Sequence, residues 1–182
     1  MRVTIATVMS VDARITQGDH TRPTLWRSSE DSVVLKGLIA HNQVLVMGRN
    51  TYETVRPRPS ENHLQVVLTS DPQRFASLHE PGGLEFVSLS PAALIANLKL
   101  RGYEKVLLLG GSSNLPFLEA GLVDQIYLTV EPSLFGRGQP LTDTMTTVVP
   151  LQLVSCKQLN QEGTLLLHYA VVKREDDATA VR

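Results

Sequence analysis

The 182-residue sequence has a single cysteine and no excess of charge of either sign. Cys156 has no cysteine to pair with and fits no Cys/His spacing typical of zinc, which argues against a disulfide scaffold or metal site and favours a reducing, cytoplasmic environment. The 17 Lys and Arg and 18 Asp and Glu residues give a net charge of -1, so no nucleic-acid partner is expected. No apolar run approaches the roughly 18 residues of a membrane span, so no membrane association is expected.

Several active-site motifs are also missing. There is no G-x-G-x-x-G, and Gly136-Arg137-Gly138 is followed by Gln139-Pro140 rather than by a helix, so a turn is expected there. The serines after Gly110-Gly111 lack the G-x-S-x-G context of a hydrolase nucleophile, and the five histidines have no partner at ligand or triad spacing. These absences argue against Rossmann, P-loop, hydrolase and metal sites. Cys156 is expected to be a small core residue in a hairpin strand.

The sequence does contain a regular alternation of short apolar runs and helical patterns. Strands are expected over residues 3–9, 44–47, 65–69, 85–89, 106–109 and 126–130, and helices after Ser28, near Tyr52, after Asp71, after Ser90 and over residues 115–120. Residues 151–159 and 164–173 follow as a β-hairpin. This order predicts a three-layer α/β domain over residues 1–174, with a mostly parallel central sheet, helices on both faces and an antiparallel C-terminal hairpin. Residues 175–182 are expected to form a disordered tail.

Two of these strands stop in glycine just before a helix, the place where parallel sheets bind ligands. Gly48-Arg49-Asn50-Thr51 offers a backbone without a side chain, a guanidinium and the N–H groups of a helix start, which together suit a phosphate. The alternative is a capping turn with a surface arginine. The run from Gly110 to Asn114 would let a flat or phosphorylated ligand approach the backbone, and its alternative is close packing of helix on sheet.

Trp26 and Asp31 place an aromatic ring and a carboxylate on either side of a helix start. Partial burial beside Trp26 would raise the pKa of the Asp31 carboxyl toward neutrality, which suits a proton donor. An Asp in the first turn of a helix often serves only to favour the helix dipole. Asp12, after the first strand, is open to a similar interpretation as a turn residue.

Together these motifs resemble the dihydrofolate-reductase-like superfamily, and most closely its branch of reductase domains from riboflavin biosynthesis. The resemblance covers nearly the whole chain. It rests on the following segments: Met9-Ser10-Val11-Asp12, Trp26 with Asp31, Met47 to Glu53, Gly110-Gly111, Gly121-Leu122-Val123-Asp124 and Pro132-x-Leu134-x-Gly136-x-Gly138-x-Pro140-Leu141. It implies a dihydrofolate-reductase-like fold, a homodimer, and NADPH-dependent hydride transfer to a small heterocyclic substrate such as 5-amino-6-(5-phosphoribosylamino)uracil.

Carried over residue by residue, the resemblance also implies a site. The cofactor-binding residues would be Gly48, Arg49, Thr51, Thr69, Ser70, Gly110, Gly111, Ser112, Ser113 and Asn114. Asp12 and Trp26 would contact the substrate, and Asp31 would deliver or relay the proton. The Gly110-Gly111 peptide is expected to be strained, with a cis bond as one form of that strain. Late apolar strand residues around Leu165 and Leu167 are expected at the dimer interface.

Three positions differ from the riboflavin branch. Leu109 stands where an acidic residue usually precedes the glycine pair, and the apolar stretch around Leu38 and Ile39 replaces a basic residue. Asp12-Ala13 replaces an Asp-Gly turn. Reduction of a pterin or folate is therefore an alternative function, and a non-catalytic ligand-binding relative is another.

Overall fold

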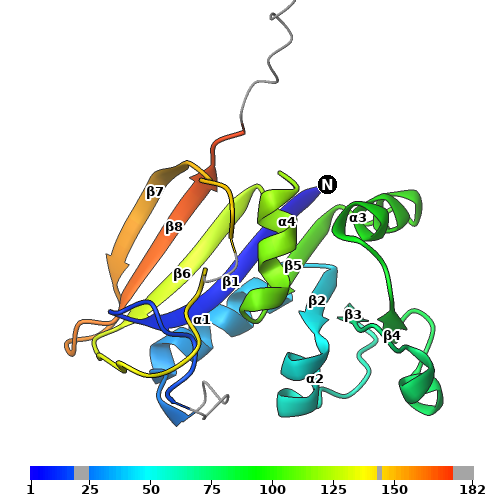
Figure 1. Cartoon of the computed structure of the whole chain (residues 1–182), viewed down its shortest axis with the longest axis horizontal. Helices are drawn as coiled ribbons and strands as arrows, with labels where there is room; N and C mark the ends of the chain where they lie inside the picture. Colours follow the sequence, from blue (N-terminus) through cyan, green and yellow to red (C-terminus); the bar gives the residue numbers. More distant parts are fainter. Residues whose placement is uncertain (19–24, 143–144, 174–182) are drawn as a thin grey trace, which may run out of the picture.

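The computed structural model describes residues 1–18, 25–142 and 145–173. Within these ranges eight strands form one sheet in the order β4-β3-β2-β5-β1-β6-β8-β7 (Figure 1). Its parallel part consists of β1 (Arg2–Ser10), β2 (Val44–Gly48), β3 (Leu64–Leu68), β4 (Leu84–Val87), β5 (Lys105–Leu109) and β6 (Gln125–Glu131). The hairpin of β7 (Leu151–Gln158) and β8 (Leu165–Val171) extends it, with β8 antiparallel to β6.

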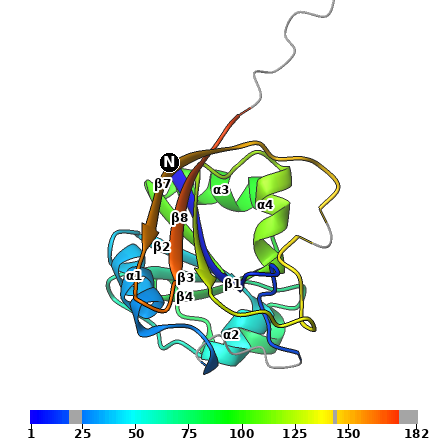
Figure 2. The same ribbon diagram turned by 90° about the vertical axis from the view of Figure 1, so that its left-hand side faces the viewer.

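The helices lie on both sides of this sheet, as the alternating pattern predicts. They are α1 (Ser29–Ala40), α2 (Arg49–Val55), α3 (Pro91–Leu100) and α4 (Leu115–Glu119), with two 3₁₀ turns, η2 (Gln73–Leu78) and η3 (Ser112–Asn114). Figure 2 shows α1 on one side of the sheet and α3 and α4 on the other. The expected three-layer α/β architecture with a C-terminal hairpin is confirmed.

Local sequence signals account for most element boundaries. The Ser28 hydroxyl accepts a hydrogen bond from the Asp31 N–H and so caps α1, and Ser90 caps α3 in the same way, with Pro91 at the first helical position. The four residues from Val44 to Met47 are all buried, as expected for a continuous apolar run in a parallel sheet. The largest core cluster packs α3 and α4 against the sheet through Leu94, Ile95, Leu98 and Phe117.

The hairpin departs from one expectation. Every residue of β7, one of the two edge strands, is exposed, so neither face of this strand is covered by the described part of the chain. Cys156 is consequently exposed, so its expected place in the core is wrong. Residues 175–182, expected to form a disordered tail, lie outside the described residues. In the described part of the chain, no helix has the length and apolarity to cross a membrane and no cluster of three or more His, Cys, Asp or Glu side chains could hold a metal ion.

Candidate functional site

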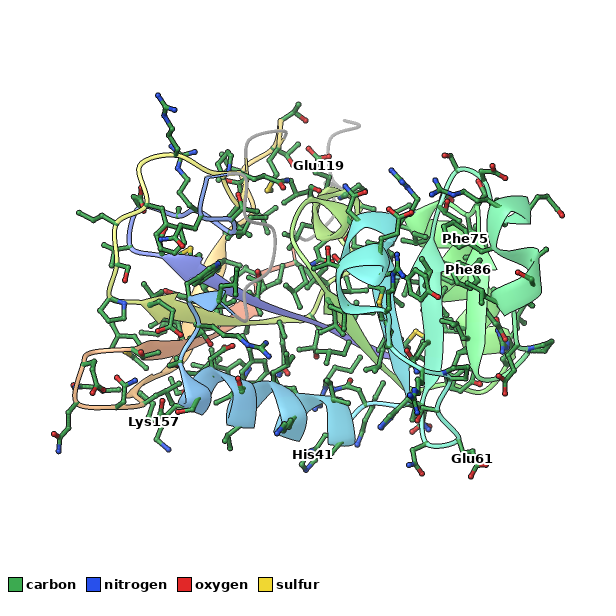
Figure 3. The ribbon with its side chains drawn as sticks, turned by 90° about the horizontal axis from the view of Figure 1, so that it is seen from below. His41, Glu61, Phe75, Phe86, Glu119 and Lys157 are labelled. Atoms are coloured by element: carbon green, nitrogen blue, oxygen red, sulfur yellow. The ribbon has the colours of Figure 1, made fainter. Side chains whose placement is uncertain are left out.

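A cleft of about 700 Å³ opens between α1 and the sheet, at the carboxyl ends of the central strands. Figure 3 shows α1 running alongside the sheet, with side chains of both extending into the space between them. The cleft is lined by residues toward the ends of β1, β2, β5 and β6, by the segment around Ile15 and Thr16, and by both glycine loops. Of the residues predicted to form a site, eight line the cleft: Asp31, Gly48, Arg49, Thr51, Gly110, Gly111, Ser112 and Ser113.

The two glycine loops contact each other at one end of this cleft. A β-carbon on Gly48 would lie 2.9 Å from the Ser113 β-carbon, and one on Gly110 would lie 2.5 Å from Thr51 Oγ1. The Asn114 side chain is buried and donates a 2.8 Å hydrogen bond to the Gly110 carbonyl, so it holds the loop without lining the cleft. Close packing of the two loops therefore explains why both positions are glycine.

The Gly110-Gly111 link is unusual in its dihedral angles. The residues that the structure describes contain no cis peptide bond, so the cis form considered for this peptide is wrong. Gly110 instead adopts φ +100°, a conformation that residues with a β-carbon rarely adopt. A β-carbon on Gly111 would overlap Ile15 Cδ1, which lies directly against this backbone. Because glycine adopts positive φ readily, this conformation explains the need for glycine at position 110 and does not by itself show the strain expected here.

Arg49 stands at the first residue of α2 and supplies positive charge at this end of the cleft. Its guanidinium lies 3.1 Å from Glu53 Oε2, and Arg74 contacts the other oxygen of the same carboxylate at 3.1 Å. Two guanidinium groups thus share one carboxylate and leave a net positive charge. Among the described residues no side chain caps the start of α2, so its first N–H groups are available to an anion.

Thr69 and Ser70 follow the end of β3 and lie outside the cleft lining. Thr69 is buried, and its hydroxyl accepts a 3.2 Å hydrogen bond from the Asp71 N–H. Ser70 is exposed. Since β3 pairs with β2 in register, with Leu68 beside Gly48, both residues extend from the strand next to the Arg49 loop.

The other end of the cleft contains a buried carboxyl group. Asp31 is only 6% exposed, and its side chain is hydrogen-bonded to that of Thr129 on β6. Burial raises the pKa of Asp31 above its ordinary value, and the negative charge of Glu131 acts in the same direction. The Thr129 hydrogen bond and the Arg27 guanidinium, 3.8 Å away, oppose this rise in pKa. The Asp31 carboxyl is therefore easier to protonate than an exposed aspartate.

The structure places the other two predicted substrate contacts outside the cleft lining. Trp26 packs edge-on against Phe135, with ring centroids 4.9 Å apart. Asp12 accepts hydrogen bonds from the Ser10 hydroxyl at 2.6 Å and from the backbone N–H groups of Phe135 and Gly136 at 3.0 and 2.8 Å. These bonds, led by that from Ser10, lower the pKa of Asp12 to about 2. Asp12 anchors a loop, which is the alternative that its sequence position left open.

The loop that Asp12 anchors belongs to a double loop formed by residues 11–18 and 133–141. The two segments are joined by backbone hydrogen bonds, among them Ile15 N–H to the Gln139 carbonyl at 2.9 Å. A β-carbon on Gly138 would overlap the carbonyl oxygen of Thr16, which explains the second glycine of the Gly136-x-Gly138 motif. Ala13 adopts φ +58°, so the turn keeps a glycine-like conformation with alanine in that place. The double loop positions Ile15, Thr16 and Gln139 in the cleft wall.

The sequence did not single out several residues of the site. Thr129 and Tyr127 line the cleft from β6, and Glu131, two residues further along, is buried beside it. The alternation of Tyr127, Thr129 and Glu131 on one face of a strand was a usable signal, because polar residues at inward positions require partners. The apolar face of α1 also lines the cleft through Val34, Leu35, Leu38 and Ile39.

Comparison with known proteins places the chain among reductase domains. The profile of the RibD C-terminal domain matches residues 1–165. The uncharacterized protein YwjB of Bacillus subtilis (strain 168) is 28% identical over 130 residues, which cover 69% of this chain and 71% of that protein.

Two solved structures show the same fold at low sequence identity. A provisionally assigned riboflavin biosynthesis protein from Shewanella sp. PV-4 superposes with a TM-score of 0.78 and 21% identity, covering 95% of this chain and all 100% of that one. The Thermotoga maritima diaminohydroxyphosphoribosylaminopyrimidine deaminase/5-amino-6-(5-phosphoribosylamino)uracil reductase gives a TM-score of 0.75 at 16% identity over 94% of this chain. The match covers 56% of the Thermotoga chain.

Proposed function

Because the chain belongs to the RibD C-terminal domain family, which consists of reductase domains, we propose that it is an NADPH-dependent oxidoreductase of the 5-amino-6-(5-phosphoribosylamino)uracil reductase type. One observation carries the proposal. The same cleft contains a positively charged helix start with glycine loops at one end and a buried carboxyl, Asp31, at the other. A reductase that adds a hydride and a proton to one substrate requires both features.

The residues at the glycine end suit a dinucleotide phosphate. Arg49 supplies charge, Thr51, Ser112 and Ser113 supply hydroxyl groups, and the start of α2 supplies N–H donors. Thr69 and Ser70, on the neighbouring strand end, are proposed to extend this site toward the adenosine 2′-phosphate. When bound, NADPH supplies the hydride and its electron pair. The chain's own part is to hold the dinucleotide against the Gly110-Gly111 backbone and to exclude water.

Asp31 is proposed to supply the proton. Opening of the ribose ring of a phosphoribosylamine breaks its C–O bond, moves the N–H proton to that oxygen and gives a C=N bond. Addition of a hydride to the carbon of this bond leaves its electron pair on nitrogen. The protonated Asp31 carboxyl gives its O–H proton to this nitrogen, which completes the amine and leaves a carboxylate that regains a proton from water. Arg27, 3.8 Å from Asp31, would stabilise the transient negative charge. Asp12 and Trp26 lie outside the cleft lining. They are proposed to position the substrate end of the cleft indirectly, Asp12 through the double loop and Trp26 through its contact with Phe135.

We further propose that the protein works in the cytoplasm as a homodimer formed through the C-terminal hairpin. The edge strand β7 is exposed along its length and carries Leu151, Leu153 and Val154, which are 42%, 53% and 55% exposed. An exposed edge strand with apolar side chains is a surface that a second copy can cover. Leu165 and Leu167 of β8 lie half-buried next to it.

The proposed function is tested by measuring NADPH binding and then NADPH oxidation with two substrates. Binding followed by oxidation in the presence of 5-amino-6-(5-phosphoribosylamino)uracil is the expected result. Oxidation with dihydrofolate alone would favour the pterin alternative, and binding without oxidation of either would favour a non-catalytic relative. Failure to bind NADPH would overturn the assignment of the glycine loops to the cofactor.

A further inference from the structure

Glu131, at the end of β6, is a buried carboxylate with a complete set of partners. It is 4% exposed. Its Oε1 accepts hydrogen bonds from the Ser28 N–H at 2.7 Å and from the Ser28 hydroxyl at 2.9 Å, and its Oε2 accepts one from the Thr164 hydroxyl at 2.8 Å. The three donors thus occupy both oxygens of this buried carboxyl group. Glu131 thus connects β6 to the start of α1 and to the turn before β8.

The bond to the Ser28 hydroxyl also determines how that hydroxyl meets Asp31. A serine hydroxyl has one proton, and in Ser28 it points to Glu131. Its lone pair is therefore free to accept the Asp31 N–H at 3.2 Å, the hydrogen bond that caps α1. Two residues earlier on β6, Thr129 holds the Asp31 side chain. The backbone and the side chain of Asp31 are thus both fixed to β6.

The two charged side chains beside Asp31 have opposite effects on the pKa of its carboxyl group. Arg27, just before α1, favours the ionised carboxylate, while Glu131 on β6 disfavours it. Thr129 on β6 also favours the ionised form through its hydrogen bond, and burial disfavours that form most strongly. The two neighbouring carboxyl groups thus have unequal surroundings: three hydrogen-bond donors hold Glu131, whereas burial raises the pKa of Asp31.

Building on the proposed function, we propose that Glu131 is a positioning residue for Asp31. It fixes the start of α1 through Ser28, and it places a second carboxyl group on the same face of β6 as Thr129, the partner of the Asp31 side chain. Glu131 itself does not line the cleft and does not touch the substrate in this scheme.

The charge effect is tested with Glu131→Gln, which retains the shape of the side chain and an oxygen that can accept from Ser28. The carboxyl carbons of ¹³C-labelled protein are titrated by NMR, without cofactor or substrate. We expect the midpoint of Asp31 to move to lower pH in Glu131→Gln. Glu30→Gln is the matched control, because Glu30 lies half-buried on the same helix turn and its carboxylate accepts hydrogen bonds from the Ser29 hydroxyl and the Asn160 amide. An Asp31 midpoint that stays unchanged in Glu131→Gln, or that moves equally in Glu30→Gln, would overturn the proposal.

The positioning effect is tested with Ser28→Ala, which removes the hydroxyl link and leaves the Glu131 charge in place. With 5-amino-6-(5-phosphoribosylamino)uracil we expect turnover to fall roughly tenfold while NADPH affinity is unchanged, because loss of the cap and of the link to Glu131 disturbs the start of α1 and Asp31 rather than the glycine loops. Turnover equal to that of the wild type would contradict a positioning role. This variant also covers the case in which Glu131→Gln fails to fold.

The two proposals fail in different ways. If Glu131→Gln lowers the Asp31 titration midpoint but the wild-type protein oxidises no NADPH with either substrate, the coupling of the carboxyl groups stands and the reductase assignment is wrong. If the wild type is active and the alkaline limb of its pH profile is the same in Glu131→Gln, the reductase assignment stands and the role of Glu131 is wrong. When both are correct, that limb shifts to lower pH and the activity on the acidic plateau is retained.

Discussion

The hydroxyl of Thr51 occupies the space beside Gly110 that any side chain at that position would need. Thr51 Oγ1 lies 2.5 Å from the place where a Gly110 β-carbon would stand, far inside van der Waals contact. Gly110 also has φ +100°, where a β-carbon is unfavourable. The start of α2 and the turn after β5 are thus packed together so closely that one methyl group would separate them.

This contact predicts that Gly110→Ala destabilises the protein by about 3 kcal/mol, because the overlap adds to the cost of a positive φ. The matched control is Gly102→Ala, since Gly102 has φ +83° with open space around it and should cost only about 1 kcal/mol. Denaturant unfolding compares the two variants. Adding Thr51→Ala to Gly110→Ala should restore part of the lost stability, and equal losses in both single variants would show that the contact is unimportant.

Arg49→Ala should weaken NADPH binding selectively. If Arg49, with Thr69 and Ser70, binds the 2′-phosphate that only NADPH carries, loss of its guanidinium raises the NADPH dissociation constant roughly tenfold, with a smaller effect on NADH. Arg101→Ala serves as a control, because Arg101 pairs with Glu85 on another part of the surface. Dissociation constants from fluorescence titration provide the measurement. A wild-type protein that binds NADH as tightly as NADPH would remove the basis for a 2′-phosphate site.

Asp31→Asn should leave NADPH affinity nearly unchanged and lower turnover by roughly a hundredfold or more, the range for loss of a positioned acid. The amide retains the shape of the carboxyl but has no proton to transfer at neutral pH. Single-turnover kinetics separate binding from chemistry. If the asparagine variant turns over like the wild type, Asp31 acts only at the helix start; if it loses NADPH binding, the division of the cleft into cofactor and substrate ends is wrong.

The same substitution should change the pH dependence of stability. Burial raises the pKa of Asp31 in the folded protein, so the folded state binds more protons than the unfolded state once the pH exceeds the ordinary value of 3.8. The contribution of Asp31 to the free energy of unfolding is therefore fully present below that pH and is lost as the pH rises through the raised pKa. Asp31→Asn lacks this loss, so it should unfold at higher denaturant concentration than the wild type at pH 8 and at a similar concentration near pH 3. The exposed Asp71→Asn should show no such difference.

The hairpin surface predicts the oligomeric state. Leu153→Lys places a charge in the middle of the proposed interface and should convert a dimer into a monomer at micromolar concentration. Leu100→Lys is the control, since Leu100 is 90% exposed at the end of α3. Light scattering measures the mass of each variant. A monomeric wild-type protein would contradict the proposed dimer.

Local patterns were sufficient to predict the order of strands and helices. Ser28 and Ser90 cap helices because their hydroxyl groups accept hydrogen bonds from N–H groups three residues later in the chain, a local spacing that the sequence alone reveals. The prediction that Cys156 is buried was wrong, because burial depends on which elements pack together in the folded chain. Its strand has the composition of a core strand, but it became the edge of the sheet with no element over it.

The site was harder to predict for the same reason. The glycine loops could be located because each follows a buried strand, but the contact between Gly110 and Thr51 depends on strand order. Glu131 stands 103 residues from Ser28, its partner, so no spacing reveals the pair. Trp26 was placed with Asp31 because the two are close in sequence, but its ring packs against Phe135.

The central position of β1 in the sheet has a consequence for synthesis on the ribosome. β1 emerges first, but its neighbours are β5 and β6, whose paired residues extend to Glu131. At the usual rates of translation the apolar strand waits on the order of ten seconds for these partners. Strands β2, β3 and β4 pair with one another in the meantime. A newly made chain that stalls before Lys105, the first residue of β5, would therefore present β1 unpaired, which makes this apolar strand the segment that a chaperone should recognise.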